Sequence, residues 1–277
     1  MADDLLVARN IEVTYGGGGL LGGAGHKVLH GVDLTIRRGE TIGIVGESGS
    51  GKTTFGRALL RLVDVSAGEI RFDGVDITQA PDHRMRPLRR RMQMIFQDPM
   101  ASLNPRHSIR RILVEPLLFH GVARDAGDAE ARVTKILDRF ALPRIVLERN
   151  AHELSGGQRQ RIGIARAALL EPDFVLADEI VSGLDVSTQA QVLNLLKDLS
   201  RELGLAMAFI SHDLSVIRAV CDRVCVMRLG RVVEEGPCEQ VFASPKSNYT
   251  RALLDAIPLP EIDPEWLARE ALVDETQ

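Results

Sequence analysis

Apolar and polar residues alternate along residues 28–36, which is the period of a half-buried strand, and residues 5–15 predict an earlier strand that enters a turn. Residues 41–45 are a short apolar run that predicts another strand. Asp73-Gly74 separates two further short runs and is a hairpin turn signal. This part of the chain therefore predicts antiparallel β structure beside a strand that leads into a glycine-rich loop and a helix.

Farther along, apolar runs of strand length alternate with segments of helical period. The expected strands are residues 92–96, 174–177 and 206–210. One helix is predicted by the i, i+3, i+4, i+7 spacing of Val133, Ile136, Leu137 and Phe140. Others are predicted over residues 158–170 and in a longer segment that we expect Ser187 to cap. This alternation favours a mostly parallel sheet with helices on its faces.

The composition fits one large globular domain or one domain with an appendage. The 277 residues are 45% hydrophobic and 26% charged, and no apolar run approaches the roughly 20 residues that a membrane helix needs. Residues 1–10 carry acids early and do not predict a signal peptide. The stretch 16–25 is dominated by glycine, and we expect it to be a flexible surface loop.

Charge and cysteine content narrow the function further. The net charge of −4 argues against non-specific nucleic-acid binding. Residues 84–91 are basic but lack interleaved aromatic residues, so we expect a solvated or partner-facing surface and no nucleic-acid partner. The cysteines have no partner at ligand spacing and predict free thiols in a reducing compartment. They are Cys221, Cys225 and Cys238.

A glycine-rich loop between a predicted strand and a predicted helix fits the phosphate-binding pattern GxxxxGK[ST]. Its residues are Gly46, Glu47, Ser48, Gly49, Ser50, Gly51, Lys52 and Thr53. The glycines let backbone N–H groups turn toward phosphates, and the helix N-terminus adds a partial positive charge. We expect Lys52 to reach the β- and γ-phosphates of ATP and the Thr53 hydroxyl to bind Mg²⁺. Thr54 completes the predicted nucleotide-binding loop.

An apolar strand that ends in two acids supplies a second element. Residues 174–177 lead into Asp178 and Glu179, and a buried strand has no structural need for adjacent acids at its tip. Taken alone, the acids fit an exposed strand end or a helix cap equally well. Beside a phosphate loop, they predict that Asp178 supports Mg²⁺ and that Glu179 orients or deprotonates the attacking water.

A third motif points to a family. Residues 154–158 read Leu-Ser-Gly-Gly-Gln, which alone fits an ordinary serine-capped helix start, and they continue into the polar stretch 159–161 and the run 165–167. In order with the other motifs, this segment resembles the signature motif of ATP-binding cassette (ABC) ATPases. The residues that carry the resemblance and its implied contact with ATP are Ser155, Gly156, Gly157 and Gln158.

The resemblance covers almost the whole chain and implies further roles. Tyr15 matches an aromatic residue that stacks on adenine. Gln97 matches a glutamine that links the metal site to the transmembrane partner, so it joins the expected metal-binding and catalytic residues. The loop 182–185, which ends in Asp185, matches one that crosses the dimer interface, and His212 matches a histidine that contacts the γ-phosphate. A lone histidine or tyrosine is more often structural, so these two roles rest on the resemblance.

In this family two such domains pair head to tail, with ATP between the phosphate loop of one and the signature helix of the other. A phosphate loop alone leaves the γ-phosphate open on one side, which Ser155 and the backbone of Gly156 and Gly157 of a second subunit would close. The resemblance therefore implies a second ATPase subunit, identical or a sister, and transmembrane permease subunits. It also implies an extracytoplasmic solute-binding protein and a peripheral location on the cytoplasmic face of the membrane.

Two stretches resemble the oligopeptide/dipeptide importers in particular, residues 97–106 and the tail 236–258. Importers of nickel, glutathione and other peptide-like solutes share these stretches, so such solutes are alternatives. The sequence departs from the family at Ile180, where proline is usual, and at residues 247–248, which read Ser-Asn instead of His-Pro. The scattered cysteines do not support the iron–sulfur tail of some members.

The implied fold is an α/β P-loop nucleoside triphosphatase core with an antiparallel β subdomain and an α-helical subdomain. We expect a nucleotide-binding domain over residues 1–243, with the helical subdomain at about 98–170, and a C-terminal extension over residues 244–277. A soluble ABC ATPase of translation or DNA repair is a weaker hypothesis. The former proteins usually fuse two cassettes and the latter insert a long coiled coil, whereas this chain has one cassette and too few residues between its motifs for a coiled coil. A catalytically inactive regulatory half is disfavoured by intact catalytic positions, namely Lys52, Asp178, Glu179 and His212.

Overall fold

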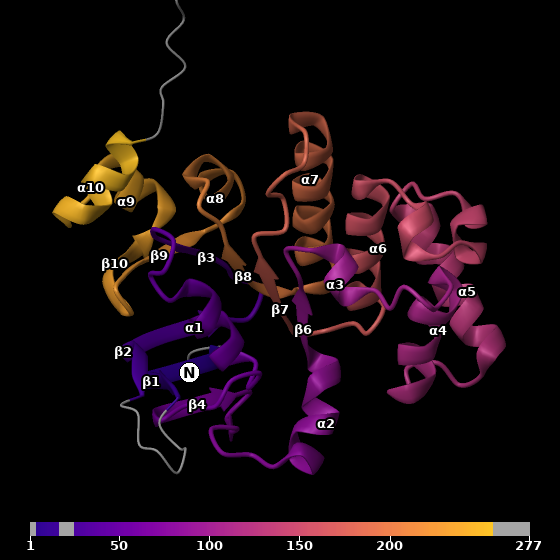
Figure 1. The fold of residues 1–277 in the computed structure, drawn as a ribbon, viewed down its shortest axis with the longest axis horizontal. Helices are drawn as coiled ribbons and strands as arrows, with labels where there is room; N and C mark the ends of the chain where they lie inside the picture. Colours follow the sequence, from indigo (N-terminus) through magenta and orange to yellow (C-terminus); the bar gives the residue numbers. More distant parts are fainter. Residues whose placement is uncertain (1–3, 17–24, 257–277) are drawn as a thin grey trace, which may run out of the picture.

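A computed structural model describes residues 4–16 and 25–256 of the chain (Figure 1). Residues 17–24 of the predicted glycine-rich loop and residues 257–277 of the predicted C-terminal extension lie outside the described part. Among the described helices, none combines the length and apolarity that crossing a lipid bilayer requires.

The N-terminal part forms a four-stranded antiparallel sheet in the order β2-β1-β4-β5. Its strands are β1 (Asp4–Tyr15), β2 (His26–Arg37), β4 (Ala67–Phe72) and β5 (Val75–Asp76). Both predicted strands are confirmed. In β2 the predicted alternation is seen at Leu34, which is buried while the residues beside it are more exposed. Asp73 and Gly74 form the predicted turn, and both have the positive φ that a tight hairpin requires.

Six strands form the second sheet, in the order β10-β9-β3-β8-β7-β6. They are β3 (Thr41–Val45), β6 (Met92–Ile95), β7 (Phe174–Asp178), β8 (Ala206–Ile210), β9 (Arg223–Arg228) and β10 (Arg231–Pro237). The β9–β10 pair is antiparallel and the other described pairs are parallel, as predicted. Alternate residues of β7 enter different cores: Leu176 packs toward the antiparallel sheet and Val175 toward the helices. Burial on both faces explains why these strands are continuous apolar runs.

Helix α1 (Lys52–Leu59) lies between the two sheets and packs on strands of both (Figure 1). A glycine permits this close approach, because a Cβ at Gly56 would come within 2.9 Å of the Leu176 and Ile210 side chains. The packing holds the start of α1 at the edge where the parallel strands end.

The remaining helices lie along the parallel sheet, with α7 and α8 over its middle and others at its two ends (Figure 1). Beside β6 lie α3 (Pro99–Ser102), α4 (Ile109–Phe119), α5 (Ala126–Arg139) and α6 (Gly156–Ala168). The 3₁₀ helices η1 (Arg144–Glu148) and η2 (Ala151–Glu153) connect α5 to α6, and α2 (Asp82–Arg91) precedes β6. The C-terminal half adds α7 (Val186–Leu203), α8 (Leu214–Val220), α9 (Cys238–Ala243) and α10 (Asn248–Asp255). Figure 1 shows α9 and α10 beside β10, at the end opposite α4 and α5.

The expected cap of α7 is wrong. The N-cap is Asp185, whose carboxylate accepts a hydrogen bond from the Thr188 N–H at 2.9 Å, so the helix begins at Val186 and Ser187 lies inside it. A carboxylate satisfies the free amides of the first turn at least as well as a hydroxyl does.

Two arginines of the basic segment 84–91 already have partners within the protein. Arg89 donates hydrogen bonds to the carbonyls of Leu60 and, at 3.0 Å, Arg61, which tie α2 to the end of α1. Arg91 pairs with Asp73 at 2.6 Å and with Asp173. Arg91 thus joins the turn of the antiparallel sheet to the start of β7 in the parallel sheet. Arg84 and Arg86 of the same segment are exposed, as expected.

Candidate functional site

Four neighbouring strands end at one edge of the parallel sheet, and each is followed by a residue predicted from sequence. The phosphate loop follows β3, His212 follows β8, Asp178 and Glu179 end β7, and Gln97 follows β6. In open α/β sheets, ligands bind outside the carboxyl ends of the strands. Tertiary structure thus brings together groups that lie far apart along the chain.

The phosphate loop has a backbone that only glycine permits at its two ends. Gly46 has φ 148°, and a Cβ there would lie 2.1 Å from the carbonyl oxygen of Met227. Gly51 has φ 99° and is the N-cap of α1, where no side chain caps the helix. The first N–H groups of α1 therefore lack a side-chain partner, which is the arrangement that binds anions at helix N-termini.

Lys52 is held inside this loop. Its ammonium group donates hydrogen bonds to the carbonyl oxygens of Gly46 and Glu47, both at 2.8 Å, and the residue is only 6% exposed. Burial lowers the pKa of Lys52, while the nearby Glu179 and Asp178 carboxylates oppose that shift. A buried cation among carbonyl oxygens is suited to an anionic ligand.

Thr53 and Asp178 form an oxygen pair beside the lysine. The Thr53 hydroxyl donates to Asp178 Oδ1 at 3.1 Å, and Asp178 is 4% exposed. Burial raises the pKa of Asp178, and the hydrogen bond from Thr53 acts in the opposite direction. A buried carboxylate and a hydroxyl are hard oxygen donors of the kind that Mg²⁺ accepts alongside phosphate oxygens. The residues present therefore fit the expected metal ion.

The Glu179 carboxylate lies between two side chains from the neighbouring strand ends. Its Oε2 accepts a hydrogen bond from Gln97 Nε2 at 3.1 Å and lies 3.7 Å from His212 Nδ1. Its backbone has φ 49°, uncommon for a residue with a side chain, and its N–H donates to the Ile210 carbonyl at 2.9 Å. The next side chain, Ile180, is buried in the core that the parallel sheet forms with helices such as α4, α5 and α6. Replacing the usual proline therefore leaves the Glu179 side chain in the site.

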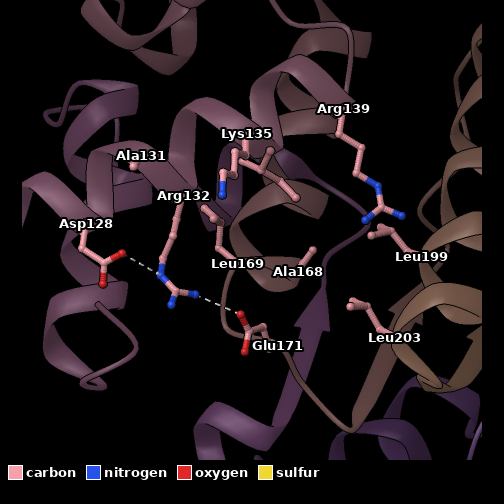
Figure 2. Close-up of a pocket in the computed structure, with 11 residues that line it drawn as sticks. Asp128, Ala131, Arg132, Lys135, Arg139, Ala168, Leu169, Glu171, Leu199 and Leu203 are labelled. Carbon is pink, nitrogen blue, oxygen red and sulfur yellow. Dashed lines mark hydrogen bonds and ion pairs between the residues drawn. The ribbon is translucent and has the colours of Figure 1, made fainter. Parts of the chain in front are cut away.

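A hollow of about 200 Å³ lies at the phosphate loop and reaches Glu179. Its lining residues are Val28, Ser48, Gly49, Gly51, Lys52, Thr53, Thr54 and Glu179. Another hollow, of about 400 Å³, lies between α5 and α7 (Figure 2). There Arg132 already pairs with Asp128 at 3.3 Å and with Glu171 at 3.0 Å, and the lining includes no strand end. The smaller hollow is therefore the candidate site for phosphates.

The signature residues are not part of this hollow. Ser155 caps α6 and exchanges hydrogen bonds with Gln158: its hydroxyl accepts from the Gln158 N–H at 3.3 Å, and its own N–H donates to Gln158 Oε1 at 3.1 Å. Helix α6 packs beside β6, which two strands, β8 and β7, separate from β3 in the sheet order. A Cβ on Gly157 would lie 3.0 Å from Thr188, so the signature lies next to the start of α7 and Asp185.

The predicted adenine-stacking residue lies at the end of β1. Tyr15 is in register with His26 and is 44% exposed, so much of its ring is open to a ligand.

One residue that contacts the loop has no predicted role in the site. Tyr249, on α10, accepts a hydrogen bond at its hydroxyl from the Glu47 N–H at 3.1 Å. No local signal could reveal this contact, because the two residues are separated by 202 positions.

A mostly parallel sheet, a glycine loop that opens a helix, and an acid pair at a neighbouring strand end define a P-loop nucleoside triphosphatase. Comparisons with known proteins narrow this class. Residues 29–182, more than half of the chain, match the family described as ABC transporter. The chain therefore belongs to the ABC transporter family, and it is an ATPase.

Individual relatives agree with this family. The chain is 56% identical over 237 residues to a peptide import ATP-binding protein of Brucella ovis, covering 86% of this chain and 74% of that protein. It is 45% identical over 258 residues to an oligopeptide transport ATP-binding protein of Streptococcus mutans, covering 93% of this chain and 82% of the other. A dimeric ATP-binding cassette solved in a post-hydrolysis state with ADP and Pi matches with a TM-score of 0.76 and 28% identity. The match covers 84% of this chain and 99% of that one. The predicted resemblance and fold class are confirmed.

Proposed function

We propose that this chain is the ATP-hydrolysing subunit of a membrane importer for peptides or peptide-like solutes, and that it works at the cytoplasmic face of the membrane. The observation that carries the catalytic part is the Glu179 carboxylate, 3.1 Å from Gln97 and beside the Lys52 and Thr53 loop. The substrate class is supported by the peptide-transport names of relatives that are 45% and 56% identical.

Each group has a role that its surroundings support. Lys52 and the loop N–H groups bind the β- and γ-phosphates, and Tyr15 stacks on the adenine. Asp178 and Thr53, with Gln97 as a further ligand, would hold Mg²⁺, which when bound would neutralise charge on the phosphate oxygens. Glu179 takes a proton from the attacking water, and His212, 3.7 Å from Glu179 Oε2, contacts the γ-phosphate.

The site is complete only in a head-to-tail pair. Its own signature residues lie beside β6 and the start of α7, so a second subunit supplies Ser155, Gly156 and Gly157 opposite the phosphate loop. The loop that ends in Asp185 lies next to that signature helix and would run along the same interface. A solved cassette with a TM-score of 0.76 to this chain is a dimer with ADP and Pi, which supports this assembly.

We assign residues 1–243 to the nucleotide-binding domain, with a helical subdomain at about 98–170, and residues 244–277 to a C-terminal extension. The segment 97–106 would dock a cytoplasmic helix of the permease subunits. Its Gln97 amide touches Glu179, so movement of that segment would reach the catalytic carboxylate directly.

The test is ATP hydrolysis by the full transporter, reconstituted in lipid with its permease subunits and its extracytoplasmic solute-binding protein. Short peptides are expected to stimulate hydrolysis, and sugars or phosphate are not. A Gln97→Ala complex should still assemble but lose the stimulation. Stimulation by nickel or glutathione alone would move the assignment to those solutes, and no stimulation by any peptide would overturn peptide import.

A further inference from the structure

The C-terminal helix α10 is anchored next to the phosphate loop. At its start, the Glu234 carboxylate on β10 accepts hydrogen bonds from the N–H groups of Lys246 at 2.8 Å and Ser247 at 3.0 Å. Along the helix, Leu253 and Leu254 pack on the core that contains Val45, the last residue before the loop. These contacts fix the position from which α10 presents its tyrosine.

Two contacts orient Tyr249. The Arg228 guanidinium lies over its ring, 4.9 Å from the centroid, and the hydroxyl accepts from the Glu47 N–H at 3.1 Å. The residue before Arg228 is Met227, whose carbonyl oxygen is the atom that a Cβ on Gly46 would strike. The end of β9, the start of the loop and α10 therefore meet at one point.

The bond from Tyr249 acts on the same peptide group that holds the lysine. The peptide unit between Gly46 and Glu47 is planar, so its carbonyl and its N–H turn together. The carbonyl of Gly46 accepts from Lys52 Nζ at 2.8 Å, and the N–H of Glu47 donates to Tyr249 at 3.1 Å. Fixing one end of this unit fixes the other.

We infer that Tyr249 is a positioning residue of the nucleotide site. Its hydroxyl holds the peptide unit between Gly46 and Glu47, and with it the carbonyl against which the Lys52 ammonium rests. The inference rests on the proposed role of the phosphate loop in binding ATP. It gives the C-terminal extension a function, because the extension supplies a group that the loop itself lacks.

Coupling of this kind is reciprocal. If docked α10 favours the loop conformation that binds nucleotide, then bound nucleotide favours docked α10 by the same factor. The amides of residues 249–255 should therefore exchange hydrogen more slowly in ATP and Mg²⁺ than without nucleotide.

Tyr249→Phe is the test, because phenylalanine keeps the ring under Arg228 and removes only the hydroxyl. Arg251→Ala is the matched control on the same helix, since the Arg251 guanidinium donates to Asn248 Oδ1 and to the Pro245 carbonyl, both at 3.2 Å and both within the segment that contains α10. The KM for ATP in the assembled transporter should rise roughly two- to tenfold in Tyr249→Phe, the range for one hydrogen bond, with kcat unchanged. Arg251→Ala should leave both values unchanged.

Two further readouts separate positioning from folding. The melting temperature of Tyr249→Phe should stay near that of the wild type, and its residues 249–255 should lose the slowing of exchange by nucleotide. An unchanged KM, or an equal rise in Arg251→Ala, would overturn the inference. Lys52→Ala, measured in parallel for ATP affinity, tests the site itself. If it loses ATP binding while Tyr249→Phe behaves as wild type, only the role of Tyr249 fails.

Discussion

Two helices of this protein have glycine at their N-terminal end, Gly51 as the N-cap of α1 and Gly156 as the first residue of α6, yet the surroundings of the two ends differ. At the start of α1 no side chain caps the helix, and Lys52 is buried among the loop carbonyls. At the start of α6 Ser155 and Gln158 cap each other, and Ser155 and Gly156 are exposed. Both helix dipoles have the same sign. The difference lies in what the rest of the chain places opposite each end.

Opposite α1 the fold supplies Asp178, Glu179 and His212 from neighbouring strand ends, all within one chain. Next to the start of α6, Gly157 lies against Thr188 at the start of α7, and the hollow that Lys52 and Glu179 line includes no signature residue. The comparison supports the proposal that the first helix start binds a ligand of its own chain and that the second completes the site of another subunit.

The largest expected effect is on the ATPase rate, and it tests the groups that lie opposite the start of α1. Glu179→Gln keeps the size and the contact with Gln97 but removes the negative charge and the basicity. Loss of a general base costs about 10²–10⁴ in rate, so turnover should fall by that factor while ATP still binds. Because each ATP would bridge two subunits without being hydrolysed, a long-lived ATP-dependent dimer should appear.

ATPase rates together with size-exclusion chromatography in ATP and Mg²⁺ check both parts. Near-normal turnover in Glu179→Gln would refute the catalytic role of this carboxylate. Slow turnover without a dimer would leave that role standing and contradict the head-to-tail pairing.

Lys52→Ala removes the buried cation at the start of α1. A hydrogen bond to a charged group contributes about 1.5–3 kcal/mol, so ATP affinity should weaken roughly 10- to 150-fold, and productive binding should be lost. Calorimetric titration of ATP into the chain measures this. Lys197→Ala is the control, because Lys197 donates to the Ala219 carbonyl at 2.9 Å, on a surface away from the loop. Unchanged affinity in Lys52→Ala would overturn the site.

Ser155→Ala tests the other helix start. The hydroxyl that would close on the γ-phosphate of a partner is lost, and turnover of the paired protein should fall by about tenfold, the value of one charge-assisted hydrogen bond. ATP affinity of the single chain should not change. Ser108→Ala is the matched control, because Ser108 caps α4 by accepting from the Arg111 N–H at 3.4 Å. Equal losses in both variants would mean that Ser155 acts only as a helix cap.

The smallest effect concerns stability. Burial raises the pKa of Asp178 above its unfolded value, so the folded state binds more protons at this group and loses stability as the pH rises through that window. Asp178→Asn removes this penalty, and the nucleotide-free variant should melt at a higher temperature at neutral pH. The difference from the wild type should shrink as the pH falls and Asp178 becomes protonated. A lower melting temperature for the variant at neutral pH would contradict the account.

Local chemistry made much of the fold predictable. Runs such as residues 41–45 and 206–210 became strands because two-sided burial demands continuous apolar residues, and Gly46 and Gly51 marked a loop that no other residue fits. The cap of α7 was misplaced because Asp185 and Ser187 are both good N-caps, and sequence alone does not rank them at two neighbouring positions.

The sequence by itself determined the chemical groups of the site, because a phosphate loop and an acid pair are contiguous motifs with a strand or a helix on each side. Only the tertiary structure decided which groups meet. The order β3-β8-β7-β6 places Gln97 and His212 on either side of Glu179, and the docking of α10 brings Tyr249 to Glu47 across 202 positions. The physical reason is that strand order and helix docking depend on burying apolar faces far apart in the chain, which no local pattern encodes.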